Sequence, residues 1–399
     1  MATIKKVVFI MGSLFCKKEY DLFGIKTLEK NGFEVEVWEI INFMRSDISR
    51  SVLANDDIIH TNLKIFKTKK EILTALDSID KSVFVFTILY FEPIIHFIYR
   101  ALSRKKVKFA LFEAWYAPFG DRKTFKRHST VVERIKMRCS WDWLKSFIVR
   151  HMPLWSLNIK PADYVFAGGA KSFGRIQPQN NNTKLVFLHA PNYDRYLIAK
   201  KCSIEEGKNF VVFLDGFLPF HPDFLYMRLK NPTSADNYYA SLRRLFDAIE
   251  KKLDCKIVIA AHPRSNYKEH SEKYYGDREV IKGASEGLVR NCKLVISHSS
   301  SSLGFAVLFN KPVLLISTDE IQNSRINVMI KVMAEYLGTD EIINADKQNY
   351  SLDVNKVLQI NEKAYRQYYR DYIKKPGTEE GYLWELIAKH IHNIGEQNV

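Results

Sequence analysis

Short apolar runs alternate with longer helical segments along almost the whole chain, and this alternation decides the fold class. The first run, Val7 to Ile10, is followed by a Gly12-Ser13 loop, a helical stretch that ends near Gly32 and a second run at Val35 to Trp38. Strands that are joined through helices are parallel, because a hairpin turn cannot connect them. The sequence therefore predicts doubly wound α/β domains. The further strand candidates are Val83 to Phe86, Lys108 to Phe112, Tyr164 to Phe166, Leu185 to Leu188, Phe210 to Leu214, Lys256 to Ala261, Leu294 to Ser297 and Val313 to Ile316.

A short charged stretch at 202–209 interrupts the alternation, which restarts at Phe210. A chain of 399 residues is also long enough for two domains. We predict a Rossmann-like domain over residues 1–205, a second over 206–350 and C-terminal helices over 351–399. Two such domains are expected to face each other across a cleft, with ligands at the carboxyl ends of the strands.

The cysteines and the apolar segments exclude other classes of protein. The five cysteines are scattered and form no C-x-x-C pair, which excludes a disulfide scaffold and a zinc ribbon and favours a reducing, cytoplasmic compartment. The N-terminal apolar run is too short for a signal peptide. The most apolar window, Ser82 to Leu102, contains Glu92, Pro93 and Arg100. We therefore predict a buried strand and a helix there, and not a membrane span.

Polar residues stand directly after the predicted strands of the second domain. Since the carboxyl ends of parallel strands lie at one edge of a sheet, we expect these residues to meet in one site. They are Asp215-Gly216, His262-Pro263-Arg264, His298 with Ser299 to Ser302, and Ser317 to Glu320.

The serine run is typical of a phosphate site. Ser299, Ser300 and Ser301 come just before an apolar helix that starts near Leu303, and a helix N-terminus with added hydroxyl donors binds phosphate. The alternative is ordinary capping of a buried helix. We assign the serines, with Arg264, His298 and Glu320, to the donor-phosphate side of the site.

Two residues are candidates for proton transfer. His262 is held in an extended conformation by Pro263 and could donate a hydrogen bond or a proton to a departing phosphate; the alternative is a histidine that bonds loop carbonyls. Asp215 could act as general base for a hydroxyl nucleophile, or form a simple Asp-Gly turn. A second His-Pro pair, His221-Pro222, is predicted to anchor a loop.

Residues that follow strands of the first domain are predicted to form the opposite, acceptor-side wall. They are Gly12, Ser13, Glu113 and His189.

Several familiar motifs are missing from the sequence. There is no G-x-G-x-x-G after the first strand and no Lys-bearing phosphate loop, which argues against dinucleotide oxidoreductases and nucleoside triphosphatases. There is also no Asp-X-Asp. We therefore expect no cofactor and no metal, and no transferase that holds a diphosphate through a metal ion.

The order Asp-Gly, His-Pro, Ser-Ser resembles the motifs of bacterial sialyltransferases and related capsule or lipopolysaccharide glycosyltransferases of the GT-B fold. The resemblance covers Asp215-Gly216, His262-Pro263 and Ser299-Ser300, whereas Leu214 stands where the family has a second acid. It implies a metal-independent, inverting transfer of a CMP-activated nonulosonic sugar of the sialic, legionaminic, pseudaminic or Kdo type to a cell-surface glycan. The serines would bind the phosphate, His262 would protonate it and Asp215 would act as base.

The net charge of +15 lies almost wholly in the first half of the chain. Residues 122–150, part of a predicted basic insert at about 120–150, interleave Lys and Arg with Trp and aliphatic side chains. This pattern favours peripheral binding to an anionic membrane at the inner face, where a glycolipid acceptor would lie. A solvated basic face and nucleic-acid binding are the alternatives, and no nucleic-acid motif accompanies the charge.

Two further functions remain open from the sequence. One is a GT-B transferase with a UDP-sugar or CDP-alcohol donor, because a run of serines does not discriminate between donors with one phosphate and donors with two. The other is a non-catalytic protein that binds a nucleotide or a glycan, to which the missing acid at Leu214 points.

Overall fold

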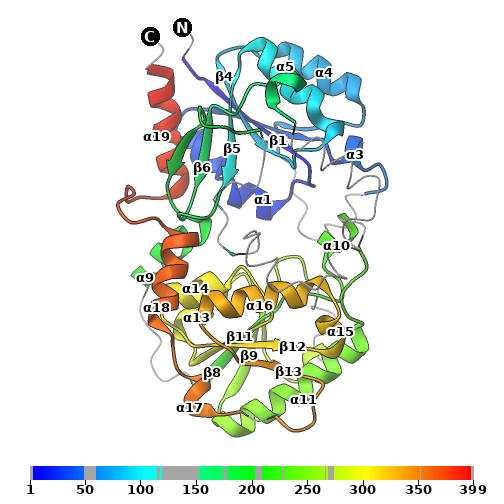
Figure 1. Cartoon of the computed structure of the whole chain (residues 1–399), viewed down its shortest axis with the longest axis vertical. Helices are drawn as coiled ribbons and strands as arrows, with labels where there is room; N and C mark the ends of the chain where they lie inside the picture. The colour runs from blue at the N-terminus through cyan, green and yellow to red at the C-terminus, as the bar shows by residue number, and fades with distance from the viewer. Residues whose placement is uncertain are drawn as a thin grey trace. The chain divides into compact units, whose positions relative to one another are not determined.

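The computed structural model describes residues 3–48, 60–114, 117–118, 152–173, 178–202, 209–226, 229–265, 267, 274–350 and 352–396. These residues form two α/β units, each built on a parallel sheet (Figure 1). The predicted fold class, two doubly wound domains followed by C-terminal helices, is confirmed.

Within the described residues, the sheet of the first unit has seven strands in the order β3-β2-β1-β4-β5-β6-β7. All neighbouring strands are parallel, and the order reverses between β1 and β4, as in a Rossmann fold. The strands are β1 (Lys6–Met11), β2 (Glu34–Glu39), β3 (Leu63–Ile65), β4 (Val83–Ile88), β5 (Lys108–Glu113), β6 (Tyr164–Ala167) and β7 (Lys184–Phe187). The helices of this unit are α1 (Lys17–Leu22), α2 (Ile25–Lys30), α3 (Ile41–Met44), α4 (Lys69–Ser78), α5 (His96–Lys105) and α19 (Leu383–Glu396).

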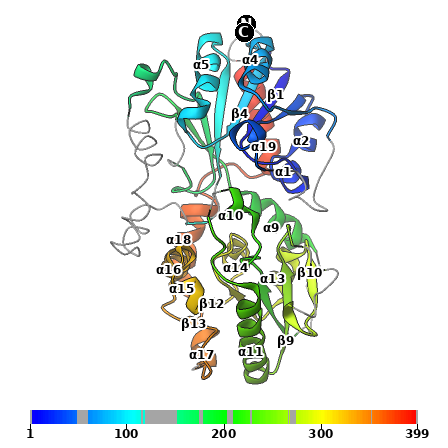
Figure 2. The same cartoon turned by 90° about the vertical axis from the view of Figure 1, so that its right-hand side faces the viewer.

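The sheet of the second unit has six parallel strands in the order β10-β9-β8-β11-β12-β13, which repeats the same topology with β8 as its first strand. Helix α11 lies on one side of this sheet and α16 on the other (Figures 1 and 2). The strands are β8 (Phe210–Leu214), β9 (Lys256–Ala261), β10 (Val280–Lys282), β11 (Leu294–Ser297), β12 (Val313–Ser317) and β13 (Ile342–Asn344). The helices are α9 (Pro191–Lys201), α10 (Pro222–Tyr226), α11 (Ala235–Leu253), α13 (Ser285–Asn291), α14 (Leu303–Leu308), α15 (Asp319–Gln322), α16 (Arg325–Leu337), α17 (Val354–Val357) and α18 (Glu362–Tyr368), which a π-helical turn (Tyr369–Ile373) continues.

Continuous apolar runs form these strands because helices cover both faces of each sheet. Strand β1 shows the rule. Its residues Val7, Phe9 and Met11 belong to one core cluster, and Val8 and Ile10 belong to another. Successive side chains point to opposite faces, so the strand is buried at every position from Val7 to Met11.

The division into units differs from the boundary predicted near residue 205. Helix α9 and the described residues of 352–374 belong to the second unit, and the stretch from Lys375 onward belongs to the first. Helix α19 lies along the first unit in both views (Figures 1 and 2). Its Trp384 is buried against Phe9, Phe86 and Phe112. The apolar face of α19 therefore completes a core whose other residues, Ile4 to Leu188, lie at least 195 positions before Leu383 in the chain.

Candidate functional site

The strand order of the second sheet reverses between β8 and β11, and ligands of such sheets bind outside the carboxyl ends of the strands at this point. Strand β8 leads into Asp215, and its two neighbours, β9 and β11, lead into His262 and His298. Main-chain pairing places Leu214 opposite Ala260 and Ser297. The structure thus brings three of the predicted strand ends together at one edge.

Asp215 connects the loop after β8 with the loop after β9 through hydrogen bonds. Its carboxylate Oδ1 accepts a hydrogen bond from the Phe217 N–H at 2.8 Å, and Oδ2 accepts one from the Tyr267 hydroxyl at 2.7 Å and one from the His262 N–H at 3.4 Å. The side chain is 3% exposed. Burial raises the pKa of the Asp215 carboxyl, although these hydrogen bonds act in the opposite direction. Through the bond from the His262 N–H, Asp215 holds the backbone of His262 in place.

Tyrosine hydroxyls lie close to Asp215, and their positions in the sequence did not predict this. The Tyr267 hydroxyl also lies 3.1 Å from that of Tyr239 and 3.4 Å from that of Tyr275. Burial, reinforced by the nearby Asp215 charge, raises the pKa of all three phenols. They remain protonated and can donate to the carboxylate. No local spacing connects these residues with Asp215, since only the folded chain brings them together.

His262 is held on both sides of its ring. Its Nδ1 accepts the Arg264 N–H at 3.2 Å, and its carbonyl accepts the N–H and the hydroxyl of Ser265, which closes a turn around Pro263. The ring stacks on Phe217, with centroids 6.2 Å apart, and contacts the His221 ring at 4.7 Å. Because an amide N–H only donates, Nδ1 is the acceptor, and a neutral His262 carries its proton on Nε2.

Phe217 adopts a backbone conformation that side chains of its size rarely adopt, with φ of 50°. The left-handed region costs a residue other than glycine roughly 1 kcal/mol. The hydrogen bond from its N–H to Asp215 helps to hold the residue there. With this backbone conformation the Phe217 ring stacks on His262. The unfavourable conformation of Phe217 therefore goes together with a contact that orients the imidazole.

Arg264 pairs with Asp223, the first acidic residue of α10. The distance from Arg264 Nη1 to Asp223 Oδ1 is 2.9 Å, and the arginine side chain is 7% exposed. The predicted phosphate-binding arginine therefore already has a carboxylate partner.

His298 directly follows β11 and is buried. Its Nδ1 donates to the Ile316 carbonyl at 2.8 Å, which leaves Nε2 to accept from the Tyr238 hydroxyl at 3.0 Å. Burial lowers the pKa of this imidazole to about 4. Both ring nitrogens are used within the protein, so these contacts support the strand ends and not a direct bond to phosphate.

The serines after His298 form the turn that leads into α14. The Ser300 hydroxyl accepts the Ser302 N–H at 3.2 Å, and Asn192 of α9 donates to the Ser301 carbonyl at 3.3 Å. All four serines are half-buried. Within the described residues, the hydroxyls of Ser299, Ser301 and Ser302 make no hydrogen bond. The turn thus holds hydroxyl groups without a hydrogen-bond partner among the described residues, directly after the end of β11.

Glu320 is engaged with α11. Its carboxylate accepts the Thr233 hydroxyl at 2.6 Å, the Ser234 N–H at 2.7 Å and the Asn237 amide at 3.2 Å. Burial opposes its ionisation, but these hydrogen bonds together lower the pKa of Glu320 below its usual range. The structure gives it the role of an anion at the start of a 19-residue helix.

The predicted acceptor-side residues lie at the carboxyl edge of the first sheet. Gly12 and Ser13 follow β1, where a side chain at Gly12 would approach Leu89 at 3.1 Å. Glu113 ends β5 and is fully buried. His189 is also fully buried, and its two nitrogens lie 3.1 Å and 2.9 Å from the carbonyl oxygens of Ala190 and Gly381. It therefore joins the end of the β7 segment to the stretch before α19.

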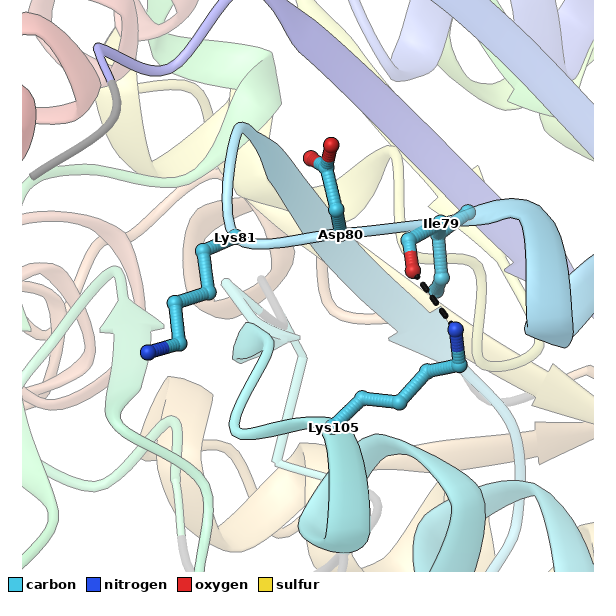
Figure 3. A pocket seen from close by; sticks show the side chains of 4 residues that line it. All are labelled: Ile79, Asp80, Lys81 and Lys105. Carbon is cyan, nitrogen blue, oxygen red and sulfur yellow. Dashed lines mark hydrogen bonds between the residues drawn. The ribbon is translucent and has the colours of Figure 1, made fainter.

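A pocket in the first unit is lined by Ile79, Asp80, Lys81 and Lys105 (Figure 3). Lys105 donates from Nζ to the carbonyl oxygens of Asp77 and Ile79. The pocket precedes β4 and follows α5, so it lies at the amino edge of the sheet, away from the predicted ligand edge.

Other predicted features are only partly covered by the described residues. The basic segment 122–150 lies outside them. Across the part of the chain that the structure describes, no three His, Cys, Asp or Glu side chains are grouped so that they could hold a metal ion. No helix in these same residues is long and apolar enough to cross a membrane.

No protein-family model and no curated protein matches the chain. Solved structures do. A variant of the wall teichoic acid polymerase TagF, soaked with CDPG, has a TM-score of 0.50 at 12% identity over 100% of this chain and 90% of that one. MnaA of S. aureus with UDP has a TM-score of 0.48 at 18% identity over 98% and 96%. UGT2 of Phytolacca americana, in complex with UDP-2fluoro-glucose and pterostilbene, has a TM-score of 0.47 at 9% identity over 98% and 99%.

At these identities the matches bear on the fold alone. Two units with parallel sheets of Rossmann topology, matched over the full chain by TagF, are the GT-B fold, as the resemblance implied. None of the matches tests the CMP-nonulosonic donor or any site residue, and both stay predictions.

Proposed function

We propose that the chain is a GT-B glycosyltransferase that moves a group from a nucleoside diphosphate donor, a UDP-sugar or a CDP-alcohol, to an acceptor hydroxyl. One observation carries the proposal. The serine hydroxyls after β11 and the His262 imidazole after β9 lie on either side of the β8 end, at the point where the strand order reverses. The likeness to TagF soaked with CDPG supports a diphosphate donor over a monophosphate one.

In this proposal the donor phosphates lie against Ser299, Ser300 and Ser301. When the acceptor hydroxyl attacks, it gives up its proton to solvent, the bond from the transferred group to the phosphate oxygen breaks, and negative charge builds up on that phosphate. Hydroxyl donors already placed there stabilise the charge without rearrangement. His262, with its proton on Nε2, donates to the departing phosphate. Asp215 holds the backbone of His262 in place.

A CMP-activated nonulosonic sugar is the second candidate donor. The Asp-Gly, His-Pro and Ser-Ser motifs follow β8, β9 and β11, which are adjacent in the sheet, and this supports the predicted resemblance to sialyltransferases. A glycan or glycolipid acceptor, a cytoplasmic location at the inner face of the membrane and independence from metal remain part of the proposal. Activity that survives treatment with EDTA would support the last of these.

Nucleotide binding tests the proposal before an acceptor is known. We expect UDP or CDP to bind the purified protein in calorimetry more tightly than UMP or CMP, and Ser299→Ala/Ser300→Ala to weaken binding at least tenfold, since each lost hydrogen bond to a charged group contributes about 1.5 to 3 kcal/mol. Ser324→Ala is the matched control, because Ser324 caps α16 and not α14. It should lower the melting temperature and leave the affinity unchanged.

The other outcomes discriminate among the alternatives. Selective binding of CMP would support the second candidate. Tight binding without turnover of any donor would support the non-catalytic nucleotide-binding protein. If no nucleotide binds, or if the serine variant binds as the wild type does, the proposed site is wrong.

A further inference from the structure

The two His-Pro segments of the second unit are built alike. In His221-Pro222-Asp223 the imidazole Nδ1 accepts the N–H of Asp223 at 3.2 Å, and in His262-Pro263-Arg264 the imidazole Nδ1 accepts the N–H of Arg264, also at 3.2 Å. Each proline starts a tight turn that brings the third residue's N–H back to the ring. Each N–H donor makes Nδ1 an acceptor, so both neutral imidazoles carry the proton on Nε2.

The two turns are also joined to each other at two points. The imidazole rings of His221 and His262 meet edge to face, with centroids 4.7 Å apart and planes at 60°. The third residues form the ion pair between Asp223 and Arg264 at 2.9 Å. The arginine side chain is 7% exposed and that of Asp223 is 52% exposed, so the pair connects the two turns but is only partly shielded from solvent, and such pairs contribute little to stability. The two turns are therefore in direct contact through their imidazole rings and through this ion pair.

The contacts of His262 leave its ring little freedom. Phe217 stacks on one part of the ring and His221 packs against another, so both partners come from the loop after β8. Within the described residues, the charged groups that face the pair of imidazoles include Asp223, whose Oδ2 lies 3.8 Å from His221 Nδ1, Arg264 on the turn of His262, and the buried Asp215, which accepts the His262 N–H. Apart from Arg264, which belongs to the turn of His262 itself, these residues lie about 40 or more positions before His262 in the sequence.

We propose that His221 and Asp223 are positioning residues for His262, and that the two His-Pro turns act as one unit that fixes the orientation and the tautomer of the His262 imidazole. The inference deepens the proposed function, because it rests on His262 lying at the donor phosphate. It assigns a role to the second His-Pro pair, which the sequence predicted only as a loop anchor.

Nitrogen-15 NMR of histidine side chains measures the tautomer directly and needs neither donor nor acceptor. In the wild-type protein we expect His262, assigned through His262→Gln, to show the Nε2–H tautomer at neutral pH. Asp223→Ala removes the ion pair, and a second tautomer or a broadened signal of His262 should appear. Asp247→Ala is the matched control, since Asp247 forms an exposed ion pair with Arg278 on the same unit. Its His262 spectrum should equal that of the wild type.

Nucleotide affinity gives the second readout. For whichever of UDP and CDP binds the wild type, Asp223→Ala and His221→Ala should each weaken binding about threefold to tenfold, the range of a misplaced hydrogen bond, and Asp247→Ala should not. A His262 spectrum that is unchanged in both Asp223→Ala and His221→Ala would overturn the inference. If the wild type binds no nucleotide, the proposed function fails, but the spectra still decide whether these residues position His262.

Discussion

At the scale of single residues, burial shifts the two polar side chains that follow β8 and β11 toward their neutral forms. It raises the pKa of Asp215 and lowers that of His298 to about 4. The sequence predicted both positions, because a polar residue directly after a buried strand is visible in the chain itself. It could not predict that Tyr267 bonds Asp215 or that Tyr238 bonds His298, since these partners come from a distant loop and a helix.

The neutral, buried state of His298 predicts a loss of stability in acid. Its pKa in the folded protein, about 4, lies below the ordinary value of 6.5. Between these values the unfolded chain binds a proton that the folded chain does not, so the stabilisation is complete above pH 6.5 and is lost as the pH falls toward 4. We expect the melting temperature of the wild type to fall more steeply over this range than that of His298→Gln, by the equivalent of up to about 3 kcal/mol. Parallel curves for the two proteins would show that His298 is not the group responsible.

At the scale of elements, the longer strands could be predicted, including the edge strand β7, and the three-residue edge strands could not. Strands β8, β9 and β11 begin and end where the sequence predicted, because they are continuous apolar runs buried on both faces. The short strands β3, β10 and β13 were missed, since each has three residues and lies at the edge of its sheet. Periodicity cannot distinguish so short a run from a loop.

Helix α11 supports a prediction about Glu320, which the sequence placed in the donor site. In the structure Glu320 accepts hydrogen bonds from Thr233, Ser234 and Asn237 at the start of this helix. Glu320→Ala should lower the free energy of unfolding by about 1 kcal/mol, the usual cost of a lost N-terminal cap. Glu362→Ala, which removes a 78% exposed carboxylate from α18, should change it by less than about 0.5 kcal/mol. Denaturant titration measures both, and weaker nucleotide binding in Glu320→Ala with stability intact would restore its predicted donor role.

At the scale of the whole molecule, the chain does not divide once near residue 205. Ala117 and Pro118 already belong to the second unit; the chain then leaves the first unit after Ala190, builds the rest of the second and returns at Lys375 to add α19 to the first core. The helical tail itself was visible in the sequence, but its destination was not. Trp384 lies so close to Gly24 that a side chain at Gly24 would meet the indole at 2.1 Å. No local sequence pattern relates two positions so far apart, so the sequence could not predict where the tail packs.

This return path predicts that the tail is essential to the first unit. Trp384 is 5% exposed, packs on four phenylalanine rings and donates from Nε1 to the Leu22 carbonyl at 2.8 Å. Trp384→Ala should destabilise that unit by about 3 to 5 kcal/mol, and the control Trp155→Ala, at a side chain 79% exposed, should have little effect. Calorimetric melting of both variants, with and without nucleotide, would show whether the second unit keeps its ligand response. Equal melting of the two variants would contradict the placement of α19.

The most direct test of the central claim is a crystal structure of the protein with whichever of UDP and CDP binds it. We expect phosphate oxygens within hydrogen-bond distance, about 2.6 to 3.2 Å, of the Ser299 or Ser300 hydroxyl and of His262 Nε2, at the carboxyl edge of the second sheet. A nucleotide bound elsewhere, for example at the Lys105 pocket of the first unit, with the serine turn unoccupied would contradict it.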